Sequence, residues 1–236
     1  MAYIDGFIIP VTKTDKAKNT DFALRMDRHF IAYGATRVVE GWADDVTDGK
    51  VTDFKRAVRA TDDETTMFSW IEWPDKATRD AAMKKLESNA EMMAEPMPFD
   101  GKRMIYGGFE PMVDETASGT TGYIDGFVLP VTPANKAAYV AMAEKAAGKF
   151  LANGALRSSE NWGEDVPDGT VTDFKRSVLA EGDENVVFSW VEWPDKQTRD
   201  AGWGKLMADE SMQGQNMPFD GKRMFWGGFK PVVELT

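Results

Sequence analysis

The sequence contains no cysteine and only one histidine, His29. Without cysteine the chain cannot form a disulfide, a thiolate zinc site, a cysteine-ligated iron–sulfur cluster or a cysteine nucleophile. A single histidine cannot build a multi-histidine metal centre, and His29 lies beside the apolar stripe of a predicted helix, where a surface or boundary position is expected. The sequence therefore predicts no transition metal, no haem and no other cofactor.

Positive charge and long apolar runs are also scarce. Lys and Arg number 28 against 39 Asp and Glu, which gives a net charge of -11. This charge repels phosphate backbones, and no glycine-rich phosphate loop with its lysine is present, so nucleic-acid and nucleotide binding are not expected. No run of about 18 apolar residues occurs, and the N-terminal MAYIDGFIIP lacks the basic region of a signal peptide. We therefore expect a cytoplasmic protein with no membrane partner.

The most prominent feature that the sequence does contain is a tandem repeat. Residues 3–115 align with residues 123–235 at a constant offset of 120 without a gap, and 60 of the 113 pairs are identical. The stretch DETASGTTG at 114–122 is small and polar, a composition typical of a connector. The predicted organisation is two copies of one domain, residues 1–113 and 123–236, joined by a linker at 114–122.

The hydrophobic pattern predicts the same elements in each copy. The predicted strands of the first copy are YIDGFIIPV, ATRVVEGW, FKRAVRA, TMFSWIEW and KRMIYGGFEPM. A first helix covers residues 15–33 and ends at Gly34, and Asp75 caps a second helix that runs to about residue 89. The paired glycines of the last strand predict a bulge or a close backbone approach. FKRAVRA has the weaker strand pattern of the two segments before the second helix, and without it the order is βαββαβ.

This order is that of the ferredoxin-like fold, an α+β unit whose four-stranded antiparallel sheet carries both helices on one face. The other face of such a sheet is apolar and needs a covering layer, which a second copy in the same chain supplies. We therefore expect the two ferredoxin-like (βαββαβ) repeats to pair face to face with pseudo-twofold symmetry. Since this pairing is internal, the expected state in solution is a monomer or a weak dimer.

The segments YIDGF, VTDFKR, FSWIEWPDK and MPFDGKRM resemble the YbaA-like bacterial family, domain of unknown function 1428. The resemblance covers nearly the whole chain, and it departs from the usual pattern in the fusion of two copies. This family is similar to the dimeric α+β barrel superfamily, so the resemblance implies an intramolecular dimeric α+β barrel. That superfamily includes cofactor-free monooxygenases, haem-degrading enzymes and lactone isomerases, and the family brings no catalytic residue set with it.

Strand alternation places candidate binding residues on one face of each sheet. In TMFSWIEW, Trp70 and Glu72 share a face, and in the first strand the face of Asp5 also carries two aromatic side chains. We expect these faces to line the space between the sheets, with Arg37 of the neighbouring strand within reach of Glu72. The candidate ligand-binding residues are Asp5, Arg37, Trp70 and Glu72 in the first copy and Asp125, Arg157, Trp190 and Glu192 in the second.

Each candidate also has a structural interpretation. Glu72 can be a solvated residue at a strand end, Arg37 can form a structural ion pair, and the tryptophans can fill the core. The leading hypothesis is binding of a small organic molecule between the two sheets, with a cofactor-free monooxygenase or isomerase as the enzyme class, because burial would suit a carboxylate to general-base work. The alternative is a non-catalytic interaction or structural protein whose intersheet space is filled by its own side chains.

Overall fold

The computed structural model describes residues 1–210 and 217–236. The first repeat consists of β1 (Tyr3–Thr12), α1 (Lys16–Ala32), β2 (Arg37–Asp45), α2 (Phe54–Ala57), β3 (Glu64–Trp73), α3 (Lys76–Glu87), α4 (Ala90–Ala94) and β4 (Ile105–Thr116). The second consists of β5 (Tyr123–Val131), η1 (Pro133–Asn135), α5 (Lys136–Ala152), β6 (Arg157–Asp165), α6 (Phe174–Ser177), β7 (Asn185–Trp193), α7 (Lys196–Ala208) and β8 (Phe225–Leu235). Within this part of the chain, no helix is both long enough and apolar enough to span a membrane.

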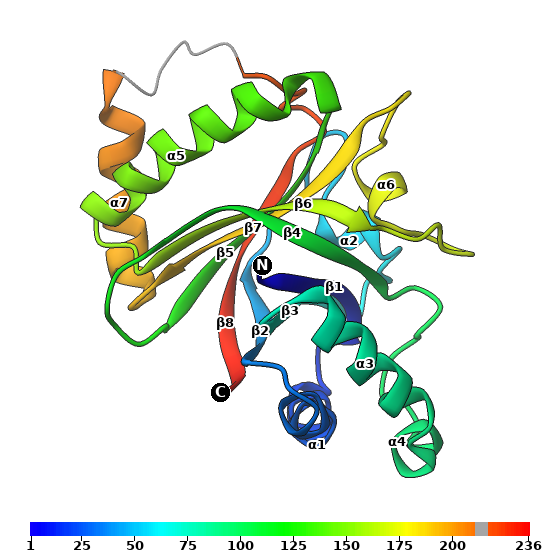
Figure 1. Cartoon of the computed structure of the whole chain (residues 1–236). Helices are drawn as coiled ribbons and strands as arrows, with labels where there is room; N and C mark the ends of the chain where they lie inside the picture. The colour runs from blue at the N-terminus through cyan, green and yellow to red at the C-terminus, as the bar shows by residue number, and fades with distance from the viewer. Residues whose placement is uncertain (211–216) are drawn as a thin grey trace.

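The strands form one closed antiparallel barrel in the order β1-β3-β2-β8-β5-β7-β6-β4. Each repeat contributes a four-stranded sheet, and the pairings of β2 with β8 and of β4 with β6 join the two sheets. The backbone groups along the edges of each sheet are therefore used by the other repeat. The predicted fold class, two ferredoxin-like repeats combined into an intramolecular dimeric α+β barrel, is confirmed (Figure 1).

The two edge pairings depend on the long last strand of each repeat. Residues 114–116 at the end of β4 pair with residues 157–159 of β6, and residues 233–235 of β8 pair with residues 38–40 of β2. The part of the connection that lies outside strands is thus residues 117–122. Each repeat extends one strand across the edge of the other, which binds the halves together beyond the contact of their apolar faces.

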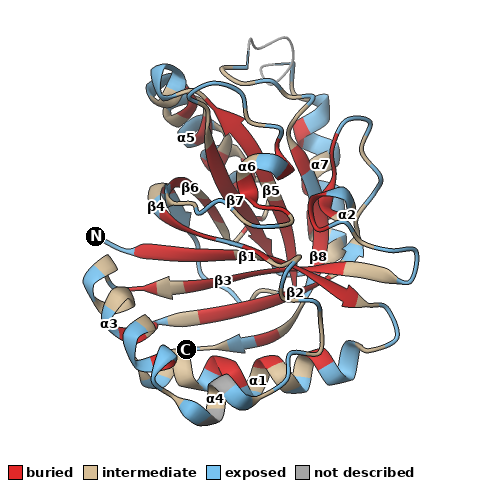
Figure 2. Cartoon of the chain, turned by 90° about the vertical axis from the view of Figure 1, so that its right-hand side faces the viewer, coloured by how far each residue is buried: buried red, intermediate tan, exposed pale blue. Residues whose placement is uncertain are grey.

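The long helices cover the outside of the barrel. Helices α1 and α3 lie over the first sheet and α5 and α7 over the second (Figure 1). Buried residues follow the strands, while exposed residues lie mainly on the outer faces of the helices and in the loops (Figure 2). Trp73 and Trp193 are buried between a sheet and its helices. The protein therefore has a core inside the barrel and further cores between each sheet and its helices.

The segment FKRAVRA does not form the predicted strand, because Phe54–Ala57 form the short helix α2. Asp53 caps this helix and accepts a hydrogen bond of 2.7 Å from the backbone amide of Arg56. One capped turn lets Phe54 enter the barrel, where it is 0% exposed, and α6 places Phe174 in the same way. The apolar residues of this segment therefore belong to a short helical turn that packs into the barrel core.

Two expectations about glycine are confirmed. Gly34 follows α1 with a φ of +110°, a left-handed conformation that side chains other than glycine rarely adopt. In β4, a Cβ atom at Gly108 would overlap the hydroxyl of Tyr3. The β4–β6 register also shifts between Gly108 and Phe109. The glycine pair therefore marks both a close approach and a bulge.

Candidate functional site

The space between the two sheets is filled by aromatic side chains. Phe68 stacks on Phe188 with ring centroids 4.5 Å apart, and Trp70 stacks on Trp190 at 4.4 Å. All four side chains are 0% exposed. Such pairs stabilise a fold by about 0.5–1.5 kcal/mol beyond the burial of their surface. The position between the sheets where a ligand was expected is therefore occupied by the chain itself.

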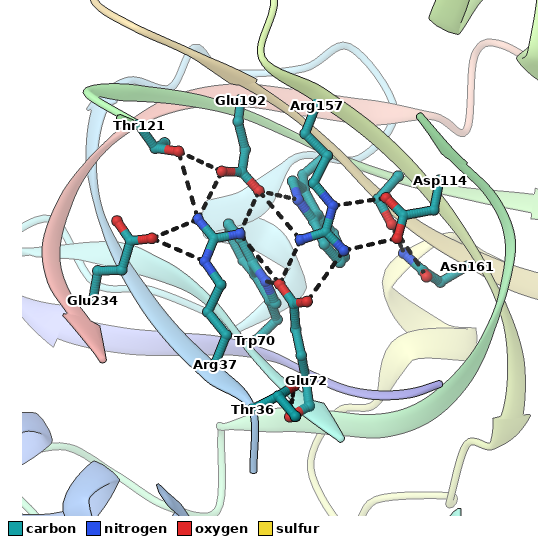
Figure 3. A network of polar contacts seen from close by, with 12 residues as sticks. Thr36, Arg37, Trp70, Glu72, Asp114, Thr121, Arg157, Asn161, Glu192 and Glu234 are labelled. Carbon is teal, nitrogen blue, oxygen red and sulfur yellow. Dashed lines mark hydrogen bonds and ion pairs between the residues drawn. The ribbon is translucent and has the colours of Figure 1, made fainter. Parts of the chain in front are cut away.

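Four predicted site residues meet where β3 and β7 end (Figure 3). Arg37 donates two hydrogen bonds of 2.7 Å to Glu192, and Arg157 donates two, of 2.6 and 3.1 Å, to Glu72. Each arginine therefore binds the glutamate of the other repeat. Arg37 also lies 3.2 Å from Glu72, so the four charges form one network across the pseudo-twofold axis.

Further groups complete this network. In both repeats the tryptophan indole donates a hydrogen bond of 3.0 Å to the glutamate two residues later. The guanidinium groups also donate to Glu234 at 2.9 Å and to Asp114 at 2.7 Å, from the last strand of the opposite repeat. Burial alone would raise the pKa of Glu192, but the contacts with Arg37, Thr121 and Arg157 together outweigh it and lower the pKa. A pocket of about 460 Å³ opens beside these groups, where a ligand would compete with carboxylates of the chain itself.

Asp5 and Asp125 lie on the other face of the sheet, so the expectation for β1 is wrong. In the register of β1 with β3, Asp5 is opposite Ile71, and Gly6 is opposite Trp70. Residues directly opposite each other share a face of the sheet. Gly6 therefore faces the interior, where a Cβ atom would come within 3.0 Å of Phe188, and the face with Asp5 points to the helices.

Both aspartates are held in ion pairs beneath the helices. Arg79 of α3 donates to Asp5 at 3.0 Å, and the indole of Trp73 donates to it at 2.8 Å. Arg199 of α7 donates to Asp125 at 2.9 Å. Burial raises the pKa of Asp5, although Arg79 acts in the opposite direction. These contacts fasten α3 and α7 to the sheets and lie on the opposite face of each sheet from the arginine–glutamate network.

A second cavity, of about 330 Å³, lies between α1 and the outer face of the first sheet. Its apolar lining includes Phe7 and Ile9 from β1, Phe22, Met26 and Phe30 from α1, Met67 and Ile71 from β3, and Phe99 and Met104. Its polar lining consists of Asn19, Asp27, Glu40 and Glu95. An apolar wall with a few convergent polar groups is typical of sites that bind small organic molecules. We name this cavity the α1 pocket.

The polar groups of the α1 pocket are buried and incompletely paired. Asn19, Asp27 and Glu40 are 2%, 3% and 8% exposed. Burial and the charge of Glu40 raise the pKa of Asp27 to about 9. Burial raises the pKa of Glu40 to about 7, although the Ser69 hydroxyl donates a hydrogen bond to it. Within the described part of the chain, Oδ2 of Asp27 and Oδ1 of Asn19 have no hydrogen-bond partner.

The second repeat fills the corresponding place with its own side chain. Asn19 corresponds to Tyr139, Asp27 to Ala147 and Glu40 to Glu160. Tyr139 is 3% exposed and packs among the counterparts of pocket-lining residues, namely Leu129, Ala143, Val187, Phe219 and Met224. Its hydroxyl donates a hydrogen bond of 2.5 Å to Glu160. The α1 pocket thus reflects a specific difference between two otherwise similar repeats.

Asn19, Asp27 and Glu40 are not among the residues predicted from strand alternation. A signal was present, because Asp27 interrupts the apolar face of α1 next to Met26 and is replaced by alanine in the second copy. Position 19 likewise changes from a small amide to a tyrosine. Among the residues that the structure describes, no group of three or more His, Cys, Asp or Glu is arranged to hold a metal ion.

Comparison with known proteins identifies the repeat. A family model described as "Protein of unknown function (DUF1428)" matches residues 2–101 and again residues 122–221. The uncharacterized protein YbaA of Escherichia coli K12 is 54% identical over 117 residues, which are 49% of this chain and 100% of YbaA. One repeat of this chain therefore corresponds to a whole relative.

Solved structures resemble the chain in fold. A "putative monooxygenase" from Fusobacterium nucleatum has a TM-score of 0.59 and 10% identity, over 99% of this chain and 93% of that one. A protein of the same description from Lactobacillus acidophilus has a TM-score of 0.57 and 11% identity, over 100% and 97% of the two chains. At such low identity the likeness concerns the fold alone.

Proposed function

The chain belongs to the DUF1428 family of proteins of unknown function, and from that premise we propose that its first repeat binds a small, largely apolar organic molecule in the α1 pocket. The difference between the repeats carries this proposal. The first repeat encloses about 330 Å³ beside Asp27 and Glu40, whereas the second places Tyr139 among the equivalent side chains. Sites for small molecules commonly measure about 300–1,000 Å³, so the α1 pocket suits a ligand of one or two rings.

The lining defines the character of the ligand. Phe22, Met26 and Phe30 offer aromatic and thioether surface to an apolar body. A ligand that loses about 200 Å² of apolar surface gains roughly 5 kcal/mol before the costs of association. This corresponds to dissociation constants between about a micromolar and a millimolar once a hydrogen bond is added. Asp27 and Glu40 supply that bond and orient the molecule.

The carboxyl pair also determines which chemistry the pocket can perform. A buried carboxyl group with a pKa near 7 can take a proton from a bound molecule and return it. The proposed activity therefore belongs to the cofactor-free reactions that begin with proton removal, either an isomerisation or an oxygenation in which molecular oxygen is the co-substrate and oxidant of the deprotonated compound. The two solved structures of similar fold are both described as monooxygenases, so oxygenation is the activity to test first.

A second candidate function is a non-catalytic interaction protein, which the packed aromatic interior favours. The pocket of about 460 Å³ at the barrel end lies outside this packed interior, and there the predicted site residues Arg37 and Arg157 could bind a ligand. An anion there must displace Glu234 or Asp114, because these carboxylates already accept hydrogen bonds from the two guanidinium groups. The α1 pocket needs no such displacement and is the stronger candidate.

Binding of neutral aromatic compounds to the whole chain tests the proposal. Naphthalene, indole and 4-methylanisole are suitable probes, with saturation-transfer NMR and the change in melting temperature as measurements. The matched control carries Asn19→Tyr, Met26→Ala and Asp27→Ala, which are the residues of the second repeat at these positions. We expect at least one probe to bind the natural chain and none to bind the filled variant. Failure of every probe, or equal binding to a folded control variant, would overturn the proposal.

A further inference from the structure

The second repeat contains a side chain at the place that corresponds to the α1 pocket. Tyr139 lies on α5 at the position that Asn19 has on α1, and its ring contacts Phe219 at a centroid distance of 5.8 Å. The equivalent Phe99 lines the α1 pocket. The tyrosine hydroxyl donates to Glu160, the counterpart of Glu40. The second repeat thus packs a phenol ring at this place, with its hydroxyl hydrogen-bonded to the glutamate.

From this internal example we propose that the ligand of the α1 pocket is a phenol, or an enol of similar shape, whose hydroxyl donates a hydrogen bond to Glu40. The inference rests on the proposed function, since it names the class of molecule that the same pocket takes. The ring would lie against Phe22, Phe30 and Phe99, where the second repeat has Met142, Phe150 and Phe219.

The surroundings of Glu40 favour a donor in the ligand. The Ser69 hydroxyl from β3 already donates to Oε2 of Glu40. From α1, the polar side chains that line the pocket are Asn19 and Asp27, and Glu95 at the pocket wall is paired with Arg25. The polar side chains that line the pocket therefore include three carboxyl groups and one amide. A ligand that brings a hydroxyl hydrogen meets this surplus of acceptors, whereas a carboxylate ligand would be repelled.

The protonation states of Asp27 and Glu40 also favour a hydroxyl donor in the ligand. The pKa of Asp27 is raised to about 9 and that of Glu40 to about 7, so near neutral pH Asp27 keeps its proton while Glu40 loses one. Hydrogen bonds to an ionised acceptor are roughly twice as strong as those between neutral groups. A phenol has a pKa of about 10 and remains a donor throughout this range. Binding of a phenol should therefore strengthen as pH rises from 6 to 8.

The decisive experiment compares 4-methylphenol with 4-methylanisole, which has the same ring but no hydroxyl hydrogen. Dissociation constants are measured by titration NMR at pH 6 and pH 8. We expect the phenol to bind about tenfold more tightly than the ether at pH 8, and this preference to shrink at pH 6. Glu40→Gln should reduce the preference to a few-fold and remove its pH dependence. The matched control Glu160→Gln, in the filled repeat, should leave both constants unchanged.

The outcomes separate the two proposals. Equal dissociation constants for the phenol and the ether at both pH values would overturn this inference and leave the proposed function standing. Absence of binding by both compounds, while naphthalene or indole binds, would also overturn this inference, and absence of binding by all four compounds would overturn the proposed function itself. A preference that persists with unchanged pH dependence in a folded Glu40→Gln protein would overturn the role of Glu40. Circular dichroism of each variant establishes that it is folded.

Discussion

Replacing Asp27 by asparagine should stabilise the protein, and the stabilisation should grow with pH. The side chain of Asp27 is buried, and within the described residues its Oδ2 atom has no hydrogen-bond partner. Burial and the neighbouring Glu40 raise its pKa to about 9, so the folded protein keeps a proton that the unfolded chain releases at much lower pH. An amide of nearly the same shape removes this requirement and loses no hydrogen bond at that atom.

The sign and size of the effect follow from proton linkage. An aspartate in an unfolded chain has a pKa of about 3.9, so between about pH 4 and pH 9 the folded state binds the additional proton and stability falls as pH rises. Each pH unit in this window costs about 1.4 kcal/mol. The penalty is close to zero at pH 4 and reaches an upper bound of about 4 kcal/mol at pH 7. Relaxation around the site and sharing of the proton with Glu40 lower this bound, so we expect a gain of about 1–4 kcal/mol at pH 7.

Urea unfolding of the whole chain at pH 4.5, 7 and 8.5 measures this effect. A gain of 1 kcal/mol corresponds to roughly 2–4 °C in melting temperature for a domain of this size, so thermal unfolding provides a second measurement. Asp21→Asn is the matched control, because Asp21 is an exposed carboxyl group on the same helix. A difference in unfolding free energy that is independent of pH, or a loss of stability at every pH, would refute the reasoning.

Three further predictions follow from the packing. Arg157→Met should lower the free energy of unfolding by roughly 1–3 kcal/mol, because it removes two hydrogen bonds from Glu72, whose side chain is 14% exposed; a loss below about 0.5 kcal/mol in urea unfolding would contradict this. Gly108→Ala should destabilise the protein because the new methyl group meets Tyr3, while Gly148→Ala, in a helix with open space around it, should stabilise it by about 0.5–1 kcal/mol; thermal unfolding of both variants checks the opposite signs. Tyr139→Asn should lower the free energy of unfolding by about 3–5 kcal/mol and open a second site, so that two molecules of 4-methylanisole bind per chain in titration NMR. A stoichiometry that stays at one would count against the equivalence of the repeats.

Sequence reasoning located the arginine–glutamate network because it depended on local rules. Alternation along β3 put Trp70 and Glu72 on one face, and the strand order of the ferredoxin-like fold brought Arg37 beside Glu72. It did not foresee that each arginine binds the glutamate of the other repeat more closely than its own. That choice depends on how the two halves rotate against each other, which strand patterns do not encode.

The sequence by itself determined the repeat, the order of elements, the fold class and the placement of Trp70 and Glu72 inside the barrel, because period, alternation and capping are local properties of the chain. Tertiary structure alone decided which face of β1 turns inward, since both faces carry large apolar side chains and only the register with β3 separates them. It also decided the position of the empty space. A cavity is a difference between the volume that the backbone encloses and the volume that side chains fill, and Asn19, Asp27 and Glu40 become neighbours only when α1 lies on the sheet.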